Sequence, residues 1–128
     1  MIKKVLLPGI LLFTPLFVQA MTLEKRIGQM LMVGFHGTQA PQGSQICRDI
    51  QAYNVGAVIL FDYNPVDKNK PKNIASKKQL ASLTKQLQAC SKDGKLLLAV
   101  DQEGGKVQRL KSKYGFYGKF PKASDVIK

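Results

Sequence analysis

Histidine and cysteine are scarce in this sequence, which limits the metal sites that it can build. The 128 residues include one histidine, His36, and two cysteines, Cys47 and Cys90. Two cysteines cannot form a structural zinc site without further ligands, and one histidine does not supply them. The sequence therefore gives no basis for a metal centre.

Two common phosphate-binding motifs are also missing. A P-loop would need glycine in place of Val100 before Gly105-Lys106, and Ser or Thr in place of Val107. The dinucleotide fingerprint needs Gly-x-Gly, which the Gly104-Gly105 turn does not provide. Neither motif therefore supports nucleotide binding.

Acidic residues are few, with 8 Asp and Glu against 20 Lys and Arg, for a formal charge of +12. Such an excess raises binding to nucleic acid or to an anionic envelope polymer as a possible function. However, the lysines scatter over predicted helix faces and loops without the interleaved aromatic residues of a single-strand binding surface. A basic polyanion-binding protein remains an alternative, and we expect no nucleic-acid partner.

Residues 1–20 have the layout of a cleaved secretory signal peptide. Lys3 and Lys4 precede a mostly apolar stretch, and Val18-Gln19-Ala20 ends it with a small-x-small pattern. The stretch is shorter than the about 20 residues of a membrane-spanning helix. We therefore expect no stable membrane span and a secreted or periplasmic domain over residues 21–128. An uncleaved membrane anchor is the alternative.

Export to an oxidising compartment would allow a disulfide between Cys47 and Cys90. The sequence does not show whether their Cα atoms lie within bonding reach. The interpretation favoured here is two small, half-buried residues on separate helices, with pairing left open.

Hydrophobic periodicity predicts an alternation of helices and strands. Helices are expected over residues 22–32, 45–53 and 73–92, and the first of them should bury a stripe made by Leu23, Ile27, Met30 and Leu31. Apolar runs predict strands over residues 32–35, 55–61 and 95–100, and residues 62–72 form a polar loop. This order implies a single α/β domain with parallel strands and right-handed crossovers.

The last predicted strand leads into the most informative stretch of the chain. Residues 96–100 form a continuous apolar run, typical of a strand buried on both faces. The run stops at Asp101 and is followed by Gln-Glu-Gly-Gly-Lys-Val-Gln, ending at Arg109. A carboxylate at the carboxyl end of a buried strand, followed by a Gly-Gly turn, is the layout of a site in an α/β protein.

The Asp101–Arg109 nonapeptide resembles the signature of glycoside hydrolase family 3, in its β-N-acetylhexosaminidase branch. The usual form has arginine where this chain has Lys106. The resemblance extends to residues 27–31, 33–35 and 56–61, and so covers roughly residues 22–121.

This resemblance implies a TIM-like (β/α)8 barrel, which takes about 250 residues. Removing 20 leader residues from 128 leaves 108. We therefore expect an α/β fold that is a partial TIM-like barrel, with the first three or so β/α units only. Such a fragment would leave the outer strand unpaired and would be marginally stable.

The resemblance also implies that Asp101 and Arg109 bind the non-reducing sugar of an N-acetylglucosamine-containing saccharide from peptidoglycan or chitin. The family's retaining mechanism uses an acid/base histidine and a nucleophilic aspartate in downstream stretches that this chain does not contain. We therefore expect a glycosidase by family, with no catalytic residue in this chain, no hydrolysis and no cofactor. A non-catalytic carbohydrate-binding remnant is an alternative, as are a turn-capping Asp101 and a surface Arg109.

Glu103 and His36 are two further candidates for catalysis. Glu103 lies two residues after Asp101, so the two side chains of an extended segment would point to opposite faces and would not form a glycosidase pair. We expect Glu103 to support the turn or to pair with a cation. His36 is predicted to be a solvated loop residue.

Overall fold

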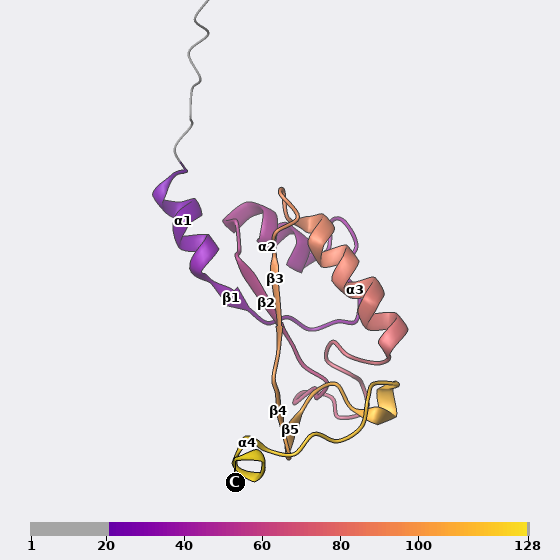
Figure 1. Ribbon diagram of the computed structural model, residues 1–128. Helices are drawn as coiled ribbons and strands as arrows, with labels where there is room; N and C mark the ends of the chain where they lie inside the picture. Colours follow the sequence, from indigo (N-terminus) through magenta and orange to yellow (C-terminus); the bar gives the residue numbers. More distant parts are fainter. Residues whose placement is uncertain (1–20, 128) are drawn as a thin grey trace, which may run out of the picture.

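The computed structural model describes residues 21–127, which form an α/β fold around a three-stranded parallel sheet (Figure 1). The predicted signal peptide lies outside the described residues. The elements run in the order α1 (Leu23–Met30), β1 (Met32–Val33), α2 (Gln45–Tyr53), β2 (Ala57–Leu60), α3 (Lys77–Cys90), β3 (Leu97–Val100), β4 (Gln102–Gly104), β5 (Val107–Gln108), the short 3-10 helix η1 (Ser112–Tyr114) and α4 (Ala123–Val126). The predicted alternation of helices and parallel strands is confirmed. Among these elements, no helix reaches the length and apolar character needed to cross a bilayer.

The sheet has the order β1-β2-β3, and its register aligns the carboxyl ends of β2 and β3. Met32 pairs with Ala57, and Leu60 pairs with Val100. Because the strands are parallel, the residues that follow Leu60 and Val100 emerge at the same edge of the sheet. This edge carries the candidate site.

The hydrophobic core lies between the sheet and the two helices α2 and α3. Its largest fully buried apolar side chains are Val58 on β2, Leu83 and Leu87 on α3, and Ile74 in the preceding loop. Val58 is contributed by the central strand, whose two edges are both paired. Complete removal of such side chains from water stabilises a fold by about 1.5–3 kcal/mol each.

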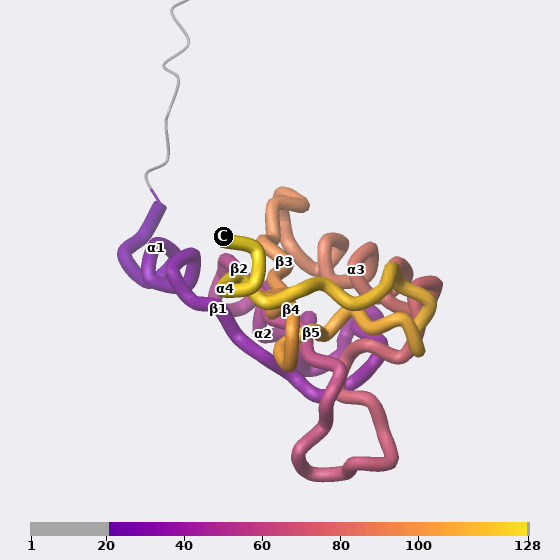
Figure 2. The backbone as a smooth tube through the Cα atoms, turned by 60° about the horizontal axis from the view of Figure 1, so that its bottom comes forward, coloured from indigo at the N-terminus to yellow at the C-terminus, as the bar shows by residue number. Residues whose placement is uncertain are grey.

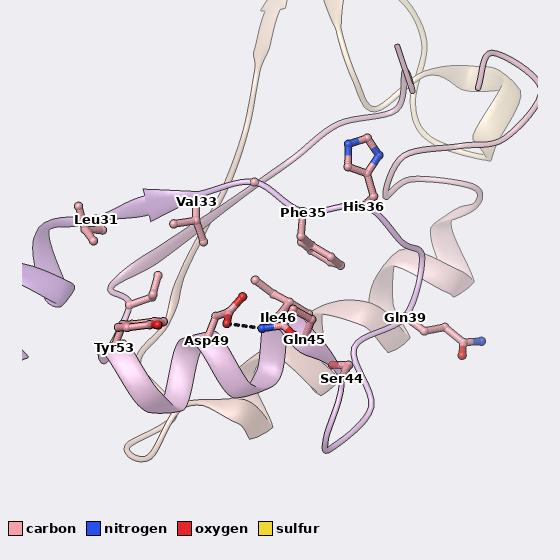
Figure 3. Close-up of a pocket in the computed structure, with 12 residues that line it drawn as sticks. Leu31, Val33, Phe35, His36, Gln39, Ser44, Gln45, Ile46, Asp49 and Tyr53 are labelled. Carbon is pink, nitrogen blue, oxygen red and sulfur yellow. Dashed lines mark hydrogen bonds between the residues drawn. The ribbon is translucent and has the colours of Figure 1, made fainter. Parts of the chain in front are cut away.

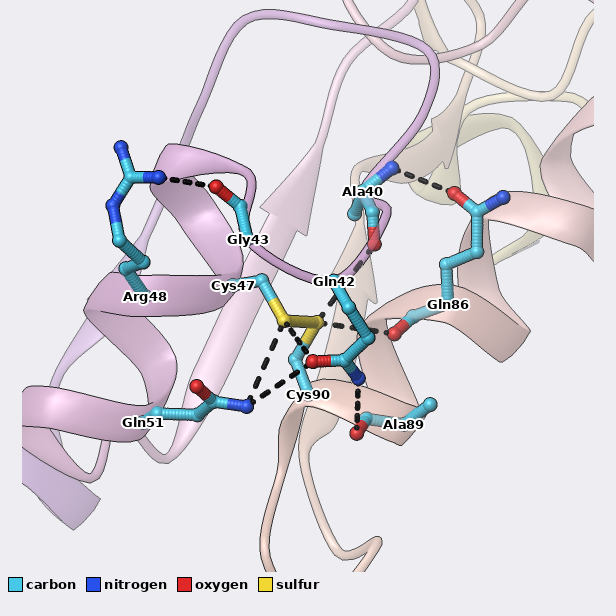
Figure 4. The surroundings of a disulfide bond; sticks show 9 residues. All are labelled: Ala40, Gln42, Gly43, Cys47, Arg48, Gln51, Gln86, Ala89 and Cys90. Atoms are coloured by element: carbon cyan, nitrogen blue, oxygen red, sulfur yellow. Dashed lines mark hydrogen bonds between the residues drawn. A yellow bond between two sulfur atoms is a disulfide. The ribbon is translucent and has the colours of Figure 1, made fainter.

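Cys47 and Cys90 form a disulfide that joins α2 to the end of α3 (Figure 4). Their Cα atoms lie 5.1 Å apart, and both residues are buried. The favoured interpretation of two unpaired cysteines was therefore wrong. Helical spacing did place each residue on a helix, but a sequence separation of 43 gives no signal that the two helices pack together.

The expected buried stripe of α1 is also wrong, because its apolar side chains are exposed. Leu23, Ile27 and Leu31 are at least 47% exposed, and Met30 is 85% exposed. The residue that α1 buries is Gly28, whose carbonyl accepts a hydrogen bond from the Gly56 amide at 3.0 Å. This helix lies at one end of the sheet instead of across its face (Figure 1).

Gly28 and Gly56 allow the backbone of α1 to contact the end of α2 and the residue that precedes β2. A Cβ atom on Gly28 would lie 1.7 Å from the Tyr53 carbonyl oxygen, and one on Gly56 would lie 2.0 Å from the Gln29 carbonyl oxygen. Neither distance is compatible with a side chain, so glycine is required at both positions.

Helix α3 begins at Lys77 and not at the predicted residue 73. Ser76 is its N-cap, and the Ser76 hydroxyl accepts a hydrogen bond from the Gln79 amide at 3.1 Å. The helix ends at Cys90, two residues before the predicted end, and Gly94 adopts a positive φ of 65° in the turn that follows. The predicted start at residue 73 is wrong because Ile74 has the apolar spacing of the helix, although its backbone is not helical.

Asn73 instead closes the loop between β2 and α3. Its Oδ1 accepts from the Phe61 amide at 3.0 Å, and its Nδ2 donates to the carbonyls of Phe35 and Gly37 at 3.1 and 3.0 Å. This fully buried side chain ties the segment after β1 to the segment after β2. The edge of the sheet that carries the site is thereby held together.

Strand β3 was expected to be buried on both faces, and this expectation is wrong. Leu97 is 59% exposed, and residues 98–100 are half-buried. It is the outer strand of the sheet over residues 21–127, so one of its edges has no strand beside it. The apolar composition of a strand predicts that its side chains are favoured in a buried position, but it does not indicate which elements cover them.

Candidate functional site

Carboxylates follow both of the neighbouring strands at the carboxyl edge of the sheet. Asp101 comes directly after β3, and Asp62 comes two residues after the end of β2. Asp62 is buried, with 4% of its surface exposed, while about a third of the Asp101 side chain is exposed. Parallel strands in register therefore deliver one buried and one accessible acid to the same edge.

Arg109 lies between these two acids. Its Nη2 is 3.4 Å from Asp101 Oδ2, and its Nη1 is 3.7 Å from Asp62 Oδ1. The guanidinium carbon also lies 5.6 Å from the centre of the Phe61 ring, within the range of a cation–π contact. The structure thus brings the predicted pair Asp101 and Arg109 together, while their role in substrate binding stays a prediction.

The β4-β5 hairpin fixes the backbone that carries Arg109. Gln102 Oε1 accepts from the amides of Arg109 and Leu110, both at 3.0 Å. Gly104 and Gly105 make the turn with positive φ values of 87° and 58°. The Gly-Gly pair predicted from the sequence is therefore a hairpin turn that returns Arg109 to a position beside Asp101.

Asp62 was missed as a site residue at the sequence level. It binds Lys111, whose Nζ lies 2.5 Å from Asp62 Oδ2, and the Tyr114 hydroxyl donates to the same oxygen at 3.4 Å. A signal was available, because Asp62 follows the apolar run of β2 much as Asp101 follows that of β3. In the sequence, Asp62 is the first residue of the polar loop that is predicted over residues 62–72.

Glu103 and His36 take no part in this cluster. Glu103 is exposed on β4, and the ion pairs among residues 21–127 do not include it, so its predicted partner cation is not found. His36 is exposed in the loop after β1, as predicted, and its ring points away from α2 (Figure 3).

A hollow of about 360 Å³ adjoins the ionic cluster. It is lined by Asp62, Lys111 and Tyr114, together with Tyr63 and lysines of the loop after β2. A larger apolar pocket of about 550 Å³ lies between β1 and α2 (Figure 3), where Asp49 accepts a hydrogen bond from Gln45 Nε2 at 2.6 Å. This second pocket contains none of the clustered ionic groups, whereas the first hollow is lined by Asp62 and Lys111 but not by Asp101 or Arg109.

The arrangement can bind a polar, uncharged ligand through hydrogen bonds. Asp101 offers carboxylate acceptors, and Arg109 offers guanidinium donors, of which the buried Nε has no partner among the described residues. Over residues 21–127 no group of three or more His, Cys, Asp or Glu side chains is placed to hold a metal ion.

The parallel sheet and its helices define the chain as an α/β protein, and the carboxylate–guanidinium pair lies at the carboxyl ends of its strands, where α/β proteins commonly bind ligands. The N-terminal domain model of glycosyl hydrolase family 3 matches residues 22–125, and the chain belongs to this family. No curated protein gives a significant match.

Solved structures agree with this assignment and with the predicted branch. A glycoside hydrolase family 3 β-N-acetylglucosaminidase from Paenibacillus sp. str. FPU-7 is 34% identical with a TM-score of 0.58, over 72% of this chain and 16% of that one. A fungal multi-domain family 3 β-N-acetylglucosaminidase is 35% identical with a TM-score of 0.64, over 82% and 11%. A β-N-acetylhexosaminidase from Beutenbergia cavernae DSM 12333 is 33% identical with a TM-score of 0.56, over 83% and 29%. The matched region is therefore less than a third of each of these proteins, and the chain is similar to the β-N-acetylhexosaminidase branch.

Proposed function

We propose that this chain is the amino-terminal part of the catalytic barrel of an exported β-N-acetylhexosaminidase, and that it supplies part of the sugar subsite. The observation that carries the proposal is an ion pair, 3.4 Å long, between Asp101 at the carboxyl end of the parallel strand β3 and Arg109, which directly follows β5 of the hairpin. The three parallel strands and the helices between them would be the first part of a TIM-like barrel, whose active sites lie at the carboxyl ends of the strands.

The proposed ligand is a terminal β-linked N-acetylglucosamine of a peptidoglycan or chitin oligomer. The accessible Asp101 carboxylate would accept hydrogen bonds from two vicinal hydroxyl groups of the sugar. The Arg109 guanidinium would donate to a sugar oxygen in a fixed geometry. Neither interaction requires a metal or an organic cofactor.

Hydrolysis is not expected from this chain. The family's retaining mechanism needs an acid/base histidine and a nucleophilic carboxylate on the two sides of the scissile bond. The single histidine of this sequence, His36, follows β1 and does not belong to the ionic cluster. We infer that the catalytic groups of the intact family domain are separate from the sugar-binding pair described above.

Export is supported by two independent features. Residues 1–20 carry a signal-peptide pattern, and Cys47 is bonded to Cys90. Disulfides form and persist in secreted and periplasmic proteins, whereas cytosolic thiols are kept reduced. A secreted or periplasmic location is therefore the one that suits both features.

The experiment is an NMR titration of the chain with N-acetylglucosamine, alongside an assay with a chromogenic β-N-acetylglucosaminide. We expect saturable binding without release of the chromophore. Asp101→Ala should weaken binding at least about tenfold, because each hydrogen bond to a charged group contributes about 1.5–3 kcal/mol.

Glu103→Ala is the matched control, since it removes the same charge from an exposed side chain two residues away. Its affinity should equal that of the unmodified chain. Binding that survives in Asp101→Ala, or that falls equally in both variants, would refute the assignment of the subsite. Turnover above the blank would refute the inference that this chain does not hydrolyse its ligand.

A further inference from the structure

Asp62 is the buried acid of the site, and no part of the proposed sugar contact uses it. It lies after β2, its side chain is 2% exposed, and it faces two cations that come from the segment after the β4-β5 hairpin. We propose that Asp62 is a positioning residue, which shares Arg109 with Asp101 and so prevents Arg109 from closing onto Asp101.

The distances show that Arg109 is held between two acids and is bound tightly by neither. Its contacts are 3.4 Å to Asp101 and 3.7 Å to Asp62, whereas a charge-assisted N–H···O bond is about 2.7–2.9 Å long. Each carboxylate therefore attracts the guanidinium against the pull of the other. Removing one acid would let Arg109 move to the acid that remains.

Lys111 weakens the electrostatic attraction between Asp62 and Arg109, because it binds the same carboxylate. It binds Asp62 Oδ2, which also accepts from the Tyr114 hydroxyl, while Oδ1 faces Arg109 without a hydrogen bond. With Lys111 present, Asp62 is largely neutralised and leaves Arg109 in the intermediate position. Without Lys111, the buried carboxylate would need another cation, and Arg109 is the one already beside it.

The consequence for ligand binding rests on the proposed function. An Arg109 that closed fully onto Asp101 would occupy the carboxylate oxygens that are to accept the sugar hydroxyls. Arg109 would also use its guanidinium donors in an internal ion pair, so that they could not bind the sugar. By sharing Arg109, Asp62 leaves both members of the sugar-binding pair with free hydrogen-bonding capacity.

The test uses 15N NMR of the arginine side chains in the full chain, which has only three arginines: Arg26, Arg48 and Arg109. The measured quantity is the rate of rotation of the Arg109 guanidinium about its Nε–Cζ bond. Asp62→Asn keeps the size of the side chain and the Tyr114 contact but removes the charge, so Arg109 should close onto Asp101 and form a direct ion pair. We expect the tighter ion pair to make the rotation at least about threefold slower.

Asp67→Asn is the matched control, because Asp67 is an acid of the same loop whose ion pair within residues 21–127 is with Lys70, at 3.5 Å. It should leave the Arg109 rotation rate unchanged. An unchanged or faster rate in a folded Asp62→Asn variant would overturn the proposal, and so would equal changes in both variants.

Lys111→Met decides the matter if Asp62→Asn does not fold. Arg109 should then move toward Asp62 and rotate more slowly, whereas an unchanged or faster rate would overturn the proposal. Titration with N-acetylglucosamine separates the two proposals. Rotation that responds as predicted in a chain that binds no sugar would support the positioning role and refute the sugar subsite. Sugar affinity that is equal in folded Asp62→Asn and the unmodified chain would overturn the positioning role.

Discussion

Reduction of the Cys47–Cys90 disulfide is expected to lower the free energy of unfolding by about 4 kcal/mol. The bond closes a loop with a sequence separation of 43. Cross-linking removes about 2.1 + 1.5R ln n cal/mol/K of entropy from the unfolded chain, which is about 13 cal/mol/K for this loop and about 4 kcal/mol at 25 °C. A domain of this size is stabilised by only about 5–15 kcal/mol in total, so the bond supplies a large share.

The assay is urea unfolding of the same preparation with and without a reductant, followed by circular dichroism. The free energies extrapolated to zero urea should differ by about 4 kcal/mol, and the thermal midpoint should fall by roughly 20 °C. Reduction changes no other atom, so the comparison isolates the cross-link from packing.

The Cys47→Ala/Cys90→Ala variant is the control, because reductant should leave its stability unchanged. A difference below about 1 kcal/mol between the oxidised and reduced chain would refute the reasoning from loop closure. It would mean that the segment between the two cysteines is already compact in the unfolded ensemble.

Three further predictions concern single side chains. Gly28→Ala should destabilise the fold by about 1–3 kcal/mol in urea unfolding, because its Cβ would lie 1.7 Å from a carbonyl oxygen. Gly118→Ala is the control and should change stability little, because its Cβ would meet no atom within 4 Å. Asn73→Ala should cost about 2–4 kcal/mol, because it leaves buried backbone groups of the segments after β1 and β2 unpaired. A loss below about 1 kcal/mol would contradict this account. Hydrogen bonds from the Ser91 side chain and the Lys95 amide lower the pKa of Asp93 below its usual 3.8. The ionised Asp93 therefore stabilises the turn between α3 and β3 above pH 3.8, and this stabilisation is lost as the pH falls through the lowered pKa. The Lys95 amide shift should titrate with a midpoint below 3.8, and this midpoint should rise in Ser91→Ala.

The order of elements was predictable from the sequence because each element carries its own local signal. The apolar runs located all three parallel strands to within three residues at each end, and Ser44 and Asn54 bound α2 as predicted. Asp101 and Arg109 were identified through a resemblance carried by a contiguous motif, which needs no knowledge of distant contacts.

What the sequence did not reveal depends on packing between distant segments. The Cys47–Cys90 bond needs α2 and α3 side by side, and the pairing of Asp62 with Lys111 joins residues 49 positions apart. The stripe on α1 illustrates the converse error, because helical periodicity indicates which side chains share a face and gives no information on whether that face is covered. Tertiary arrangement decided each of these features.

The two ends of the loop between β2 and α3 lie side by side, because Phe61 and Asn73 are hydrogen-bonded to each other. The Asn73 amide donates to the Phe61 carbonyl at 2.8 Å, and the Asn73 side chain accepts from the Phe61 amide. Figure 2 shows the intervening segment projecting from the body of the molecule. Each doubling of a flexible loop costs only about 0.6 kcal/mol in closure entropy, and Val66 near the tip is 84% exposed. A foreign peptide could therefore be grafted at this tip and displayed on the surface without displacing the strand ends.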